Sequence, residues 1–230
     1  MDKKFAIFDM DGTLVDSMSF WKTLGVEYLK SRGVSRVPED ILERIKPMTM
    51  TESADLFIRE FSLPGTPEEV AAQMNAMMDC HYRGDIPAKE GAAVYLKELK
   101  RRGVRMCVAS ATAVELQEAC LKRLGLFEYF DFLLSCEEAG GGKNRPDVYL
   151  AAARRLGAAP EETAVYEDAL YAAQTAKAAG FYVAGVFDRS AESVWDELRS
   201  LADESLTGWM EGLTALLEEQ KNEKEEMEVS

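Results

Sequence analysis

The stretch that decides the fold is Phe5-Ala6-Ile7-Phe8-Asp9-Met10-Asp11-Gly12-Thr13-Leu14-Val15. Its first four residues are apolar, and two carboxylates separated by one residue follow them directly. A short apolar run that ends at polar residues is typical of a strand buried on both faces of a parallel sheet. Ligands bind beyond the carboxyl ends of such strands, so Asp9 and Asp11 are expected to face a ligand crevice.

Four further apolar runs, rich in β-branched or aromatic residues, alternate with longer helical patterns. They cover residues 104–109, 132–134, 164–166 and 182–187. This alternation is the rhythm of βαβ units, and it predicts an α/β fold with a Rossmann-like, three-layer core around a parallel sheet. Small, polar or acidic residues follow each run. The candidate chemistry is therefore expected along one edge of the sheet.

The separation between the first two runs is much longer than a single crossover helix requires. Residues 16–86 show only helical patterning, with Val70, Met74 and Met78 at helical spacing and Thr66 placed as an N-cap. We predict that 16–86 form an inserted, all-helical cap subdomain, and that 1–15 and 87–217 form the core. Residues 218–230 are charged and lack apolar periodicity, so we expect a disordered tail there.

Composition argues against several classes of protein. The chain has 47% hydrophobic and 30% charged residues, which suits a globular protein with a buried core. Its formal net charge of −14 repels nucleic acid and anionic membrane surfaces. No apolar run reaches the roughly 18 residues of a membrane span, and the N-terminus does not read as a secretory signal. We therefore expect a cytoplasmic protein without a nucleic-acid or membrane partner. We also expect a monomer or weak dimer.

Four motifs occur in the order and at the strand ends typical of one enzyme superfamily. They are Asp9-Met10-Asp11-Gly12-Thr13 (DxDGT), then Ser110 at the end of the second run, then Lys143 ahead of Pro146-Asp147, then Glu167-Asp168. In this the chain resembles the haloacid dehalogenase superfamily of hydrolases. It is most similar to the subgroup whose helical cap follows the first core strand, which includes phosphoglycolate phosphatases and β-phosphoglucomutases.

The resemblance implies a Mg²⁺-dependent phosphatase that hydrolyses a small phosphate ester through an aspartyl-phosphate intermediate. Asp9 would be the nucleophile and Asp11 the general acid and base. Two neighbouring carboxylates raise one another's pKa, which suits such a division of roles.

The same resemblance assigns binding roles. The expected phosphate-binding residues are Ser110, Lys143, Thr13 and Ala111. The expected metal ligands are Asp9, Asp11 through its main-chain carbonyl, and Asp168, with Glu167 as the next candidate. Two of these residues have structural alternatives, because Ser110 could be only a helix N-cap and Glu167 could only hold Lys143.

The chain departs from the family pattern in the cap. Phosphosugar mutases of the subgroup tend to carry a Gly and then an Arg that binds a second phosphate, where this chain has Pro47 and Met50. Lys46, Met48 and Met50 are the candidate substrate-selecting residues. The missing arginine favours a phosphatase, and a β-phosphoglucomutase-like mutase is the alternative.

Three other functions fit the sequence less well. A dehalogenase displaces halide from carbon, a reaction in which an acid–base residue such as Asp11 has no role. A two-component receiver would lack the helical insertion. A non-catalytic binding protein on this fold would be expected to have lost Asp9 or Asp11, and both are present.

Overall fold

The computed structural model describes residues 3–45 and 47–229, with side chains described as far as residue 221. Its centre is a six-stranded, fully parallel sheet of order β3-β2-β1-β4-β5-β6. The strands are β1 (Phe5–Phe8), β2 (Arg105–Ser110), β3 (Phe132–Ser135), β4 (Thr163–Glu167), β5 (Tyr182–Val186) and β6 (Glu204–Leu206). The predicted α/β core is confirmed, and β6 is a short edge strand that the sequence patterns did not reveal.

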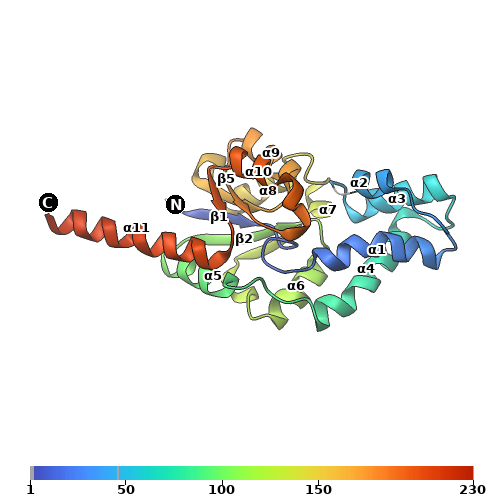
Figure 1. Cartoon of the computed structure of the whole chain (residues 1–230), viewed down its shortest axis with the longest axis horizontal. Helices are drawn as coiled ribbons and strands as arrows, with labels where there is room; N and C mark the ends of the chain where they lie inside the picture. The colour runs from blue at the N-terminus through green and yellow to red at the C-terminus, as the bar shows by residue number, and fades with distance from the viewer. Residues whose placement is uncertain (1–2, 46, 230) are drawn as a thin grey trace.

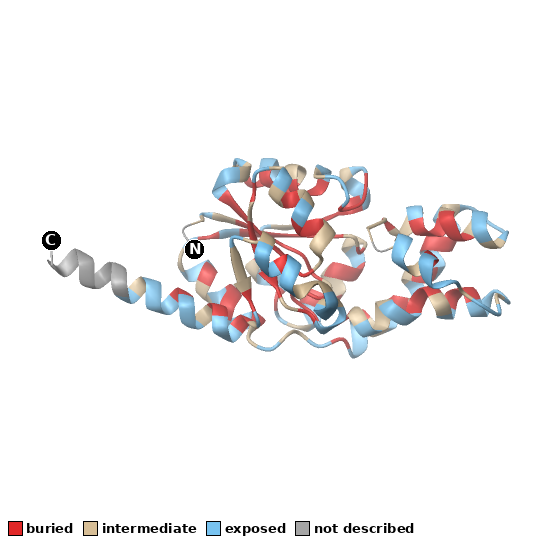
Figure 2. Cartoon of the chain, turned by 45° about the horizontal axis from the view of Figure 1, so that its top comes forward, coloured by how far each residue is buried: buried red, intermediate tan, exposed pale blue. Residues whose placement is uncertain are grey.

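Helices cover both faces of the sheet and make the three layers (Figure 1). The core helices are α5 (Ala92–Arg101), α6 (Val114–Arg123), α7 (Cys136–Ala139), α8 (Asp147–Leu156), α9 (Leu170–Ala178), α10 (Trp195–Leu201) and α11 (Trp209–Val229). Short 3-10 helices span Phe127–Tyr129, Pro160–Glu162 and Arg189–Val194. Figure 2 shows that buried residues gather in the strands and on the inward helix faces.

The residues of strand β1 show why both faces of the sheet are covered by helices. Ala6 and Phe8 pack into one apolar cluster with α5, α6 and α11, whereas Ile7 packs into the other with α8, α9 and α10. Side chains alternate across a strand, so a run of apolar residues has to be buried on both sides. The central position of β1 places the loop that follows it in the middle of the sheet edge.

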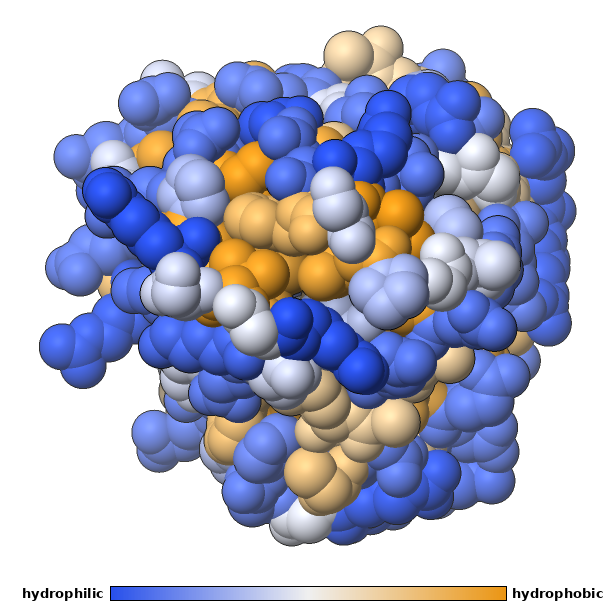
Figure 3. All heavy atoms as spheres, turned by 90° about the vertical axis from the view of Figure 1, so that its right-hand side faces the viewer, coloured by the Kyte–Doolittle hydropathy of each residue, from blue (hydrophilic) through white to orange (hydrophobic). Residues whose placement is uncertain are grey.

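Four helices lie between β1 and α5: α1 (Met18–Ser31), α2 (Glu39–Ile45), α3 (Met50–Phe61) and α4 (Pro67–Gly84). They gather at one end of the molecule (Figure 1), as the predicted helical insertion requires. Thr66 caps α4 through a capping box with Glu69, as expected, and Thr49 caps α3 in the same way with Glu52. We call α1–α4 the cap; its boundaries at residues 16 and 86 stay a prediction. Seen from the cap end, apolar side chains gather in one area surrounded by hydrophilic ones (Figure 3).

The structure differs from expectation at the C-terminus. Helix α11 continues through residues 218–229, where we expected a disordered tail, and it projects from the core (Figure 1). Glu, Lys, Gln and Met are strong helix formers, so a charged stretch without an apolar face can still extend an anchored helix. Among the residues that the structure describes, no helix has the length and apolar character needed to cross a bilayer.

Candidate active site

The loop after β1 is folded tightly by its own backbone. The main-chain N–H groups of Leu14 and Val15 both donate to the carbonyl of Met10, at 2.8 and 3.0 Å. Gly12 has φ +85°, and a Cβ atom built on it would lie 2.4 Å from Oδ2 of Asp168. The glycine of the motif is therefore required twice, for its backbone conformation and for the close approach of Asp168.

The strand ends bring Asp9, Lys143 and Glu167 together. The Lys143 ammonium donates to Oδ1 of Asp9, and it donates to Oε1 of Glu167 at 2.6 Å. All three side chains are buried, with Lys143 only 4% exposed. Burial opposes the charge on Lys143, but the attraction of Asp9 and Glu167 prevails and raises the pKa of this lysine well above its usual range. Lys143 is therefore a fixed positive charge beside the predicted nucleophile.

Glu167 is engaged by two donors on one oxygen. Besides Lys143, the buried hydroxyl of Tyr149 donates to Oε1 of Glu167 at 2.6 Å. Tyr149, on α8, did not stand out in the sequence because it occupies an ordinary apolar position of that helix. The contacts of Glu167 match the structural alternative given above, in which it holds Lys143.

Three carboxylates at this edge could hold a cation. One oxygen each from Asp9, Glu167 and Asp168 lie within 4.8 Å of one another, and all three residues are buried. Burial raises the pKa of Asp9 well above its usual range; Lys143 opposes this rise and the neighbouring acids add to it. Burial and the charge of Glu167 raise the pKa of Asp168 to about 7. A divalent cation would offset this repulsion, and carboxylate oxygens are the ligands that Mg²⁺ prefers, so the residues present fit the metal.

Thr13 and Ser110 make contacts within the site. The Thr13 hydroxyl donates to Oδ1 of Asp168 at 3.0 Å. The Ser110 hydroxyl donates to Oδ2 of Asp11 at 3.3 Å and accepts from the main-chain N–H of Thr112 at 3.1 Å. Ser110 is not the N-cap of α6, because that position is Ala113.

Asp11 lies in a different setting from Asp9, inside a ring of hydrogen-bond donors. Oδ2 accepts from the Thr112 hydroxyl at 2.7 Å as well as from Ser110. Oδ1 accepts from the hydroxyl of Ser17 at 2.6 Å, from the indole of Trp21 at 3.1 Å and from the hydroxyl of Tyr82 at 2.5 Å. Trp21 and Tyr82 come from α1 and α4, so the cap supplies part of the environment of Asp11.

Tyr82 is fixed at both its side chain and its backbone. Its side chain is fully buried, and burial together with the charge of Asp11 raises the pKa of its hydroxyl well above the usual range, so it stays a donor. The guanidinium of Arg123, on α6 of the core, donates to the main-chain carbonyl of Tyr82 at 2.9 Å and also to the carbonyl of Ile86. The sequence offered one signal for Tyr82, which continues the four-residue spacing of Val70, Met74 and Met78.

A cleft of about 310 Å³ lies between the cap and the core beside this site. Its lining residues are Met50, Thr51, Glu68, Ala71, Ala72 and Asn75 from the cap, and Ala111, Ala113, Val114, Glu115, Ser135, Glu137 and Glu138 from the core. Ala111 directly follows Ser110, so the cleft reaches the edge of the site.

The predicted cap residues have different outcomes. Met50 lines the cleft, Met48 is half-buried and is not among the lining residues, and Lys46 lies outside the described residues. Cap and core touch above the Lys143 loop, where a Cβ atom on Gly142 would lie 2.2 Å from the carbonyl oxygen of Pro47.

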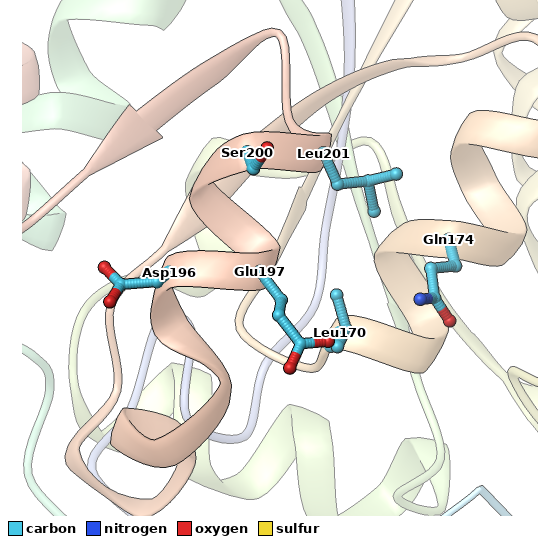
Figure 4. Close-up of a pocket in the computed structure, with 6 residues that line it drawn as sticks. All are labelled: Leu170, Gln174, Asp196, Glu197, Ser200 and Leu201. Atoms are coloured by element: carbon cyan, nitrogen blue, oxygen red, sulfur yellow. The ribbon is translucent and has the colours of Figure 1, made fainter.

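A larger hollow, of about 550 Å³, lies between α9 and α10 (Figure 4). It is lined by Leu170, Gln174, Asp196, Glu197, Ser200 and Leu201. None of the predicted site residues is among them. Of these two hollows, the smaller is the one lined by predicted site residues, Met50 and Ala111.

Comparison with known proteins agrees with this geometry. Residues 3–180 match the model of the haloacid dehalogenase-like hydrolase family. The chain belongs to this family. The haloacid dehalogenase-like hydrolase described here is similar to hexitol phosphatase A of Escherichia coli strain K12, with 29% identity over 78% of this chain and 81% of the relative. It is also similar to the phosphorylated carbohydrates phosphatase of Thermotoga maritima, with 25% identity over 76% of this chain and 80% of that one.

Among solved structures, β-phosphoglucomutase of Clostridium difficile shares the fold of this hydrolase. The two are 19% identical with a TM-score of 0.77, covering 96% of this chain and 98% of the other. The family and its phosphatase relatives make this protein a phosphoric monoester hydrolase.

Proposed function

We propose that this hydrolase is a Mg²⁺-dependent phosphatase of a small monophosphorylated polyol or sugar, acting through an aspartyl phosphate on Asp9. The observation that carries the proposal is the contrast between the two motif carboxylates. Asp9 lies beside Lys143 and the acid cluster, whereas Asp11 lies among hydroxyl and indole donors. Different surroundings suit different chemical roles.

In the first step, a carboxylate oxygen of Asp9 forms a bond to phosphorus and the bond from phosphorus to the ester oxygen breaks. The departing alkoxide takes a proton from Asp11. In the second step a water molecule, deprotonated by Asp11, attacks the same phosphorus, which releases inorganic phosphate and restores the Asp9 carboxylate. Lys143 supplies positive charge beside Asp9.

The donors around Asp11 indicate which of its oxygens carries that proton. Oδ1 faces the hydroxyls of Ser17 and Tyr82, which can turn and accept, but also the Trp21 indole, which can only donate, so a proton on Oδ1 would meet one group unable to accept it. Oδ2 faces the hydroxyls of Ser110 and Thr112, which can turn and accept. We therefore assign the transferred proton to Oδ2, on the side of the predicted phosphate-binding Ser110.

Asp9, Asp168 and the main-chain carbonyl of Asp11 would hold the Mg²⁺, which supplies charge to the phosphate oxygens when bound. Glu167 is the weaker candidate because Lys143 and Tyr149 already donate to its Oε1.

The cleft supports an uncharged leaving group. Its described lining includes Glu68, Glu115, Glu137 and Glu138 and no lysine or arginine. Carboxylates repel a second phosphate, whereas Asn75, Thr51 and Ser135 can hydrogen-bond hydroxyl groups. Two relatives of this chain, a hexitol phosphatase and a phosphorylated carbohydrates phosphatase, agree with such a substrate.

A panel of phosphorylated hexitols, hexoses, nucleotides and carboxylic acids, assayed for phosphate release with Mg²⁺, tests the proposal. We expect the highest kcat/KM among the polyol and sugar monophosphates, and no turnover by Asp9→Asn. Activity of Asp9→Asn within about tenfold of wild type would exclude the covalent mechanism. A best substrate that bears a second anionic group would overturn the substrate class.

The mutase alternative has its own assay. The enzyme is incubated with hexose 1-phosphate and a hexose bisphosphate primer, and both products are followed. We expect inorganic phosphate to form. Hexose 6-phosphate forming faster than inorganic phosphate would favour the mutase.

A further inference from the structure

A tryptophan distant in sequence contacts the backbone of the motif loop. The indole N–H of Trp209, in the first turn of α11, donates to the main-chain carbonyl of Thr13 at 3.0 Å. Trp209 is 1% exposed. It lies beyond residue 180, where the family match ends, so the contact joins the catalytic loop to a segment outside that match.

The ring of Trp209 is held in place on several sides. Its centroid lies 4.8 Å from that of Tyr95, 5.6 Å from that of Tyr166 and 6.0 Å from that of Phe8. Tyr95 and Tyr166 are themselves joined by a hydrogen bond of 2.8 Å between their hydroxyls. A ring packed in this way holds its N–H in one position, and the peptide that receives the bond is held with it.

Thr13 passes this constraint on to Asp168. While its carbonyl accepts from Trp209, its hydroxyl donates to Oδ1 of Asp168 at 3.0 Å. The adjoining Gly12 lies against Oδ2 of the same carboxylate. The orientation of the Asp168 carboxylate thus depends on where the peptide of Thr13 lies.

We propose that Trp209 is a positioning residue for the metal site, acting through Thr13 to orient the Asp168 carboxylate. This inference rests on the metal site of the proposed function. Groups that orient metal ligands from behind are typically worth about 10- to 100-fold in metal affinity. Trp209 acts on the ligand Asp168 through Thr13 and not directly, so we expect the loss of its indole N–H to lower the metal affinity by the smaller of these factors, about tenfold.

The test measures Mn²⁺ binding to the folded protein by electron paramagnetic resonance, without substrate. Trp209→Phe removes the N–H and keeps an aromatic ring. Tyr95→Phe is the matched control, because it removes a hydrogen bond from the same aromatic cluster and leaves Thr13 untouched. We expect Trp209→Phe to weaken Mn²⁺ binding about tenfold and Tyr95→Phe to leave it within twofold of wild type.

A merely structural role for Trp209 predicts something else, namely that both variants lower Tm and neither changes Mn²⁺ affinity. That result overturns the proposal, as does a wild-type protein that binds no Mn²⁺. Should Trp209→Phe fail to fold, β-(3-benzothienyl)alanine at position 209 replaces the N–H with sulfur at nearly constant shape, and the same loss of affinity is expected. Because the assay involves no turnover, its result holds even if the enzyme hydrolyses no phosphorylated polyol.

Discussion

The hydroxyl of Tyr82 lies 2.5 Å from Oδ1 of Asp11, although 71 positions separate the two residues in the chain. Tyr82 belongs to the last turn of cap helix α4, and Asp11 belongs to the loop after the first core strand. The subdomain that covers the cleft therefore also contacts the proposed general acid.

Replacing Tyr82 with Phe should slow the step in which Asp11 donates its proton. We expect kcat for an alkyl phosphate to fall about tenfold, because general acid catalysis contributes about 10²–10⁴ and one of the groups holding the acid is lost. Tyr28→Phe is the control, since Tyr28 is a buried cap tyrosine whose hydroxyl bonds Gln73 at 2.9 Å. Equal losses in the two variants would mean that Tyr82 only stabilises the cap.

Asp11→Asn should depend on the leaving group. With an alkyl phosphate we expect a loss of at least about 100-fold, because the alkoxide departs without a proton. With a nitrophenyl phosphate the loss in that cleavage step should be much smaller, since a phenolate leaves unaided. Steady-state and burst measurements on both substrates separate the two steps, and identical losses in the burst rate would contradict the acid role.

The two adjacent acids of the fourth motif should behave differently on substitution. We expect Asp168→Asn to abolish Mg²⁺ binding, whereas Glu167→Gln keeps it and loses activity because Lys143 is less firmly held. Titration calorimetry with Mg²⁺ and the recovery of EDTA-treated enzyme measure this. If Glu167→Gln loses the metal and Asp168→Asn retains it, our ligand assignment is off by one residue.

Adding a cation to the cleft should relax discrimination against a second phosphate. Glu115, in the first turn of α6, lines the cleft, and Glu115→Lys reverses its charge. We expect the ratio of kcat/KM for hexose bisphosphate to that for hexose monophosphate to rise at least about fivefold, by attraction of the second dianion. Glu197→Lys makes the same change in the first turn of α10, on the opposite face of the sheet, and should leave the ratio unchanged.

Glu98 should make an acid-labile contribution to stability. Hydrogen bonds from Arg101, opposed by burial and aided by Arg102, lower the pKa of Glu98 to about 2 from its ordinary 4.5. A carboxylate with a lowered folded-state pKa stabilises the fold above its unfolded pKa, and this stabilisation disappears as the pH falls through the folded value. We expect Glu98→Gln to cost about 1 kcal/mol in the free energy of unfolding at pH 7. The difference from wild type, measured by urea denaturation, should shrink between pH 4.5 and 2; a constant difference would exclude this role.

The sequence predicted the site best where a polar or acidic residue lies at the end of a core strand. Asp9, Ser110, Glu167 and Asp168 each end or follow a core strand, and a parallel sheet brings those ends to one edge whatever the intervening sequence. Lys143 could be added from the resemblance, because its motif has a fixed place in the chain order.

The residues behind that edge were not predictable in the same way. Tyr82, Tyr149 and Trp209 occupy apolar positions of helices, where an aromatic residue is ordinarily core, and only the packing of distant elements shows where their polar atoms point. Lys89 was missed for a related reason: it pairs with Asp188 at 2.7 Å, a residue almost a hundred positions away whose charge acts on Asp168. Residues 218–229 were predicted to be disordered because they lack apolar periodicity. Such periodicity indicates packing against a core, whereas the intrinsic helix propensity of the residues can by itself continue a helix that is already anchored.

Arg123 ties the end of the cap to the core. Its guanidinium, on α6 of the core, donates to the main-chain carbonyls of Tyr82 and Ile86, so the end of α4 and the segment that follows it are bonded to the core. We expect a cap movement that keeps these two hydrogen bonds to part the contacts between Pro47 and Gly142 and between the Thr51 amide and Glu137. Tyr82 would then keep its hydrogen bond to Asp11 while the cleft is open, so the proposed general acid would retain one of its donors between turnovers.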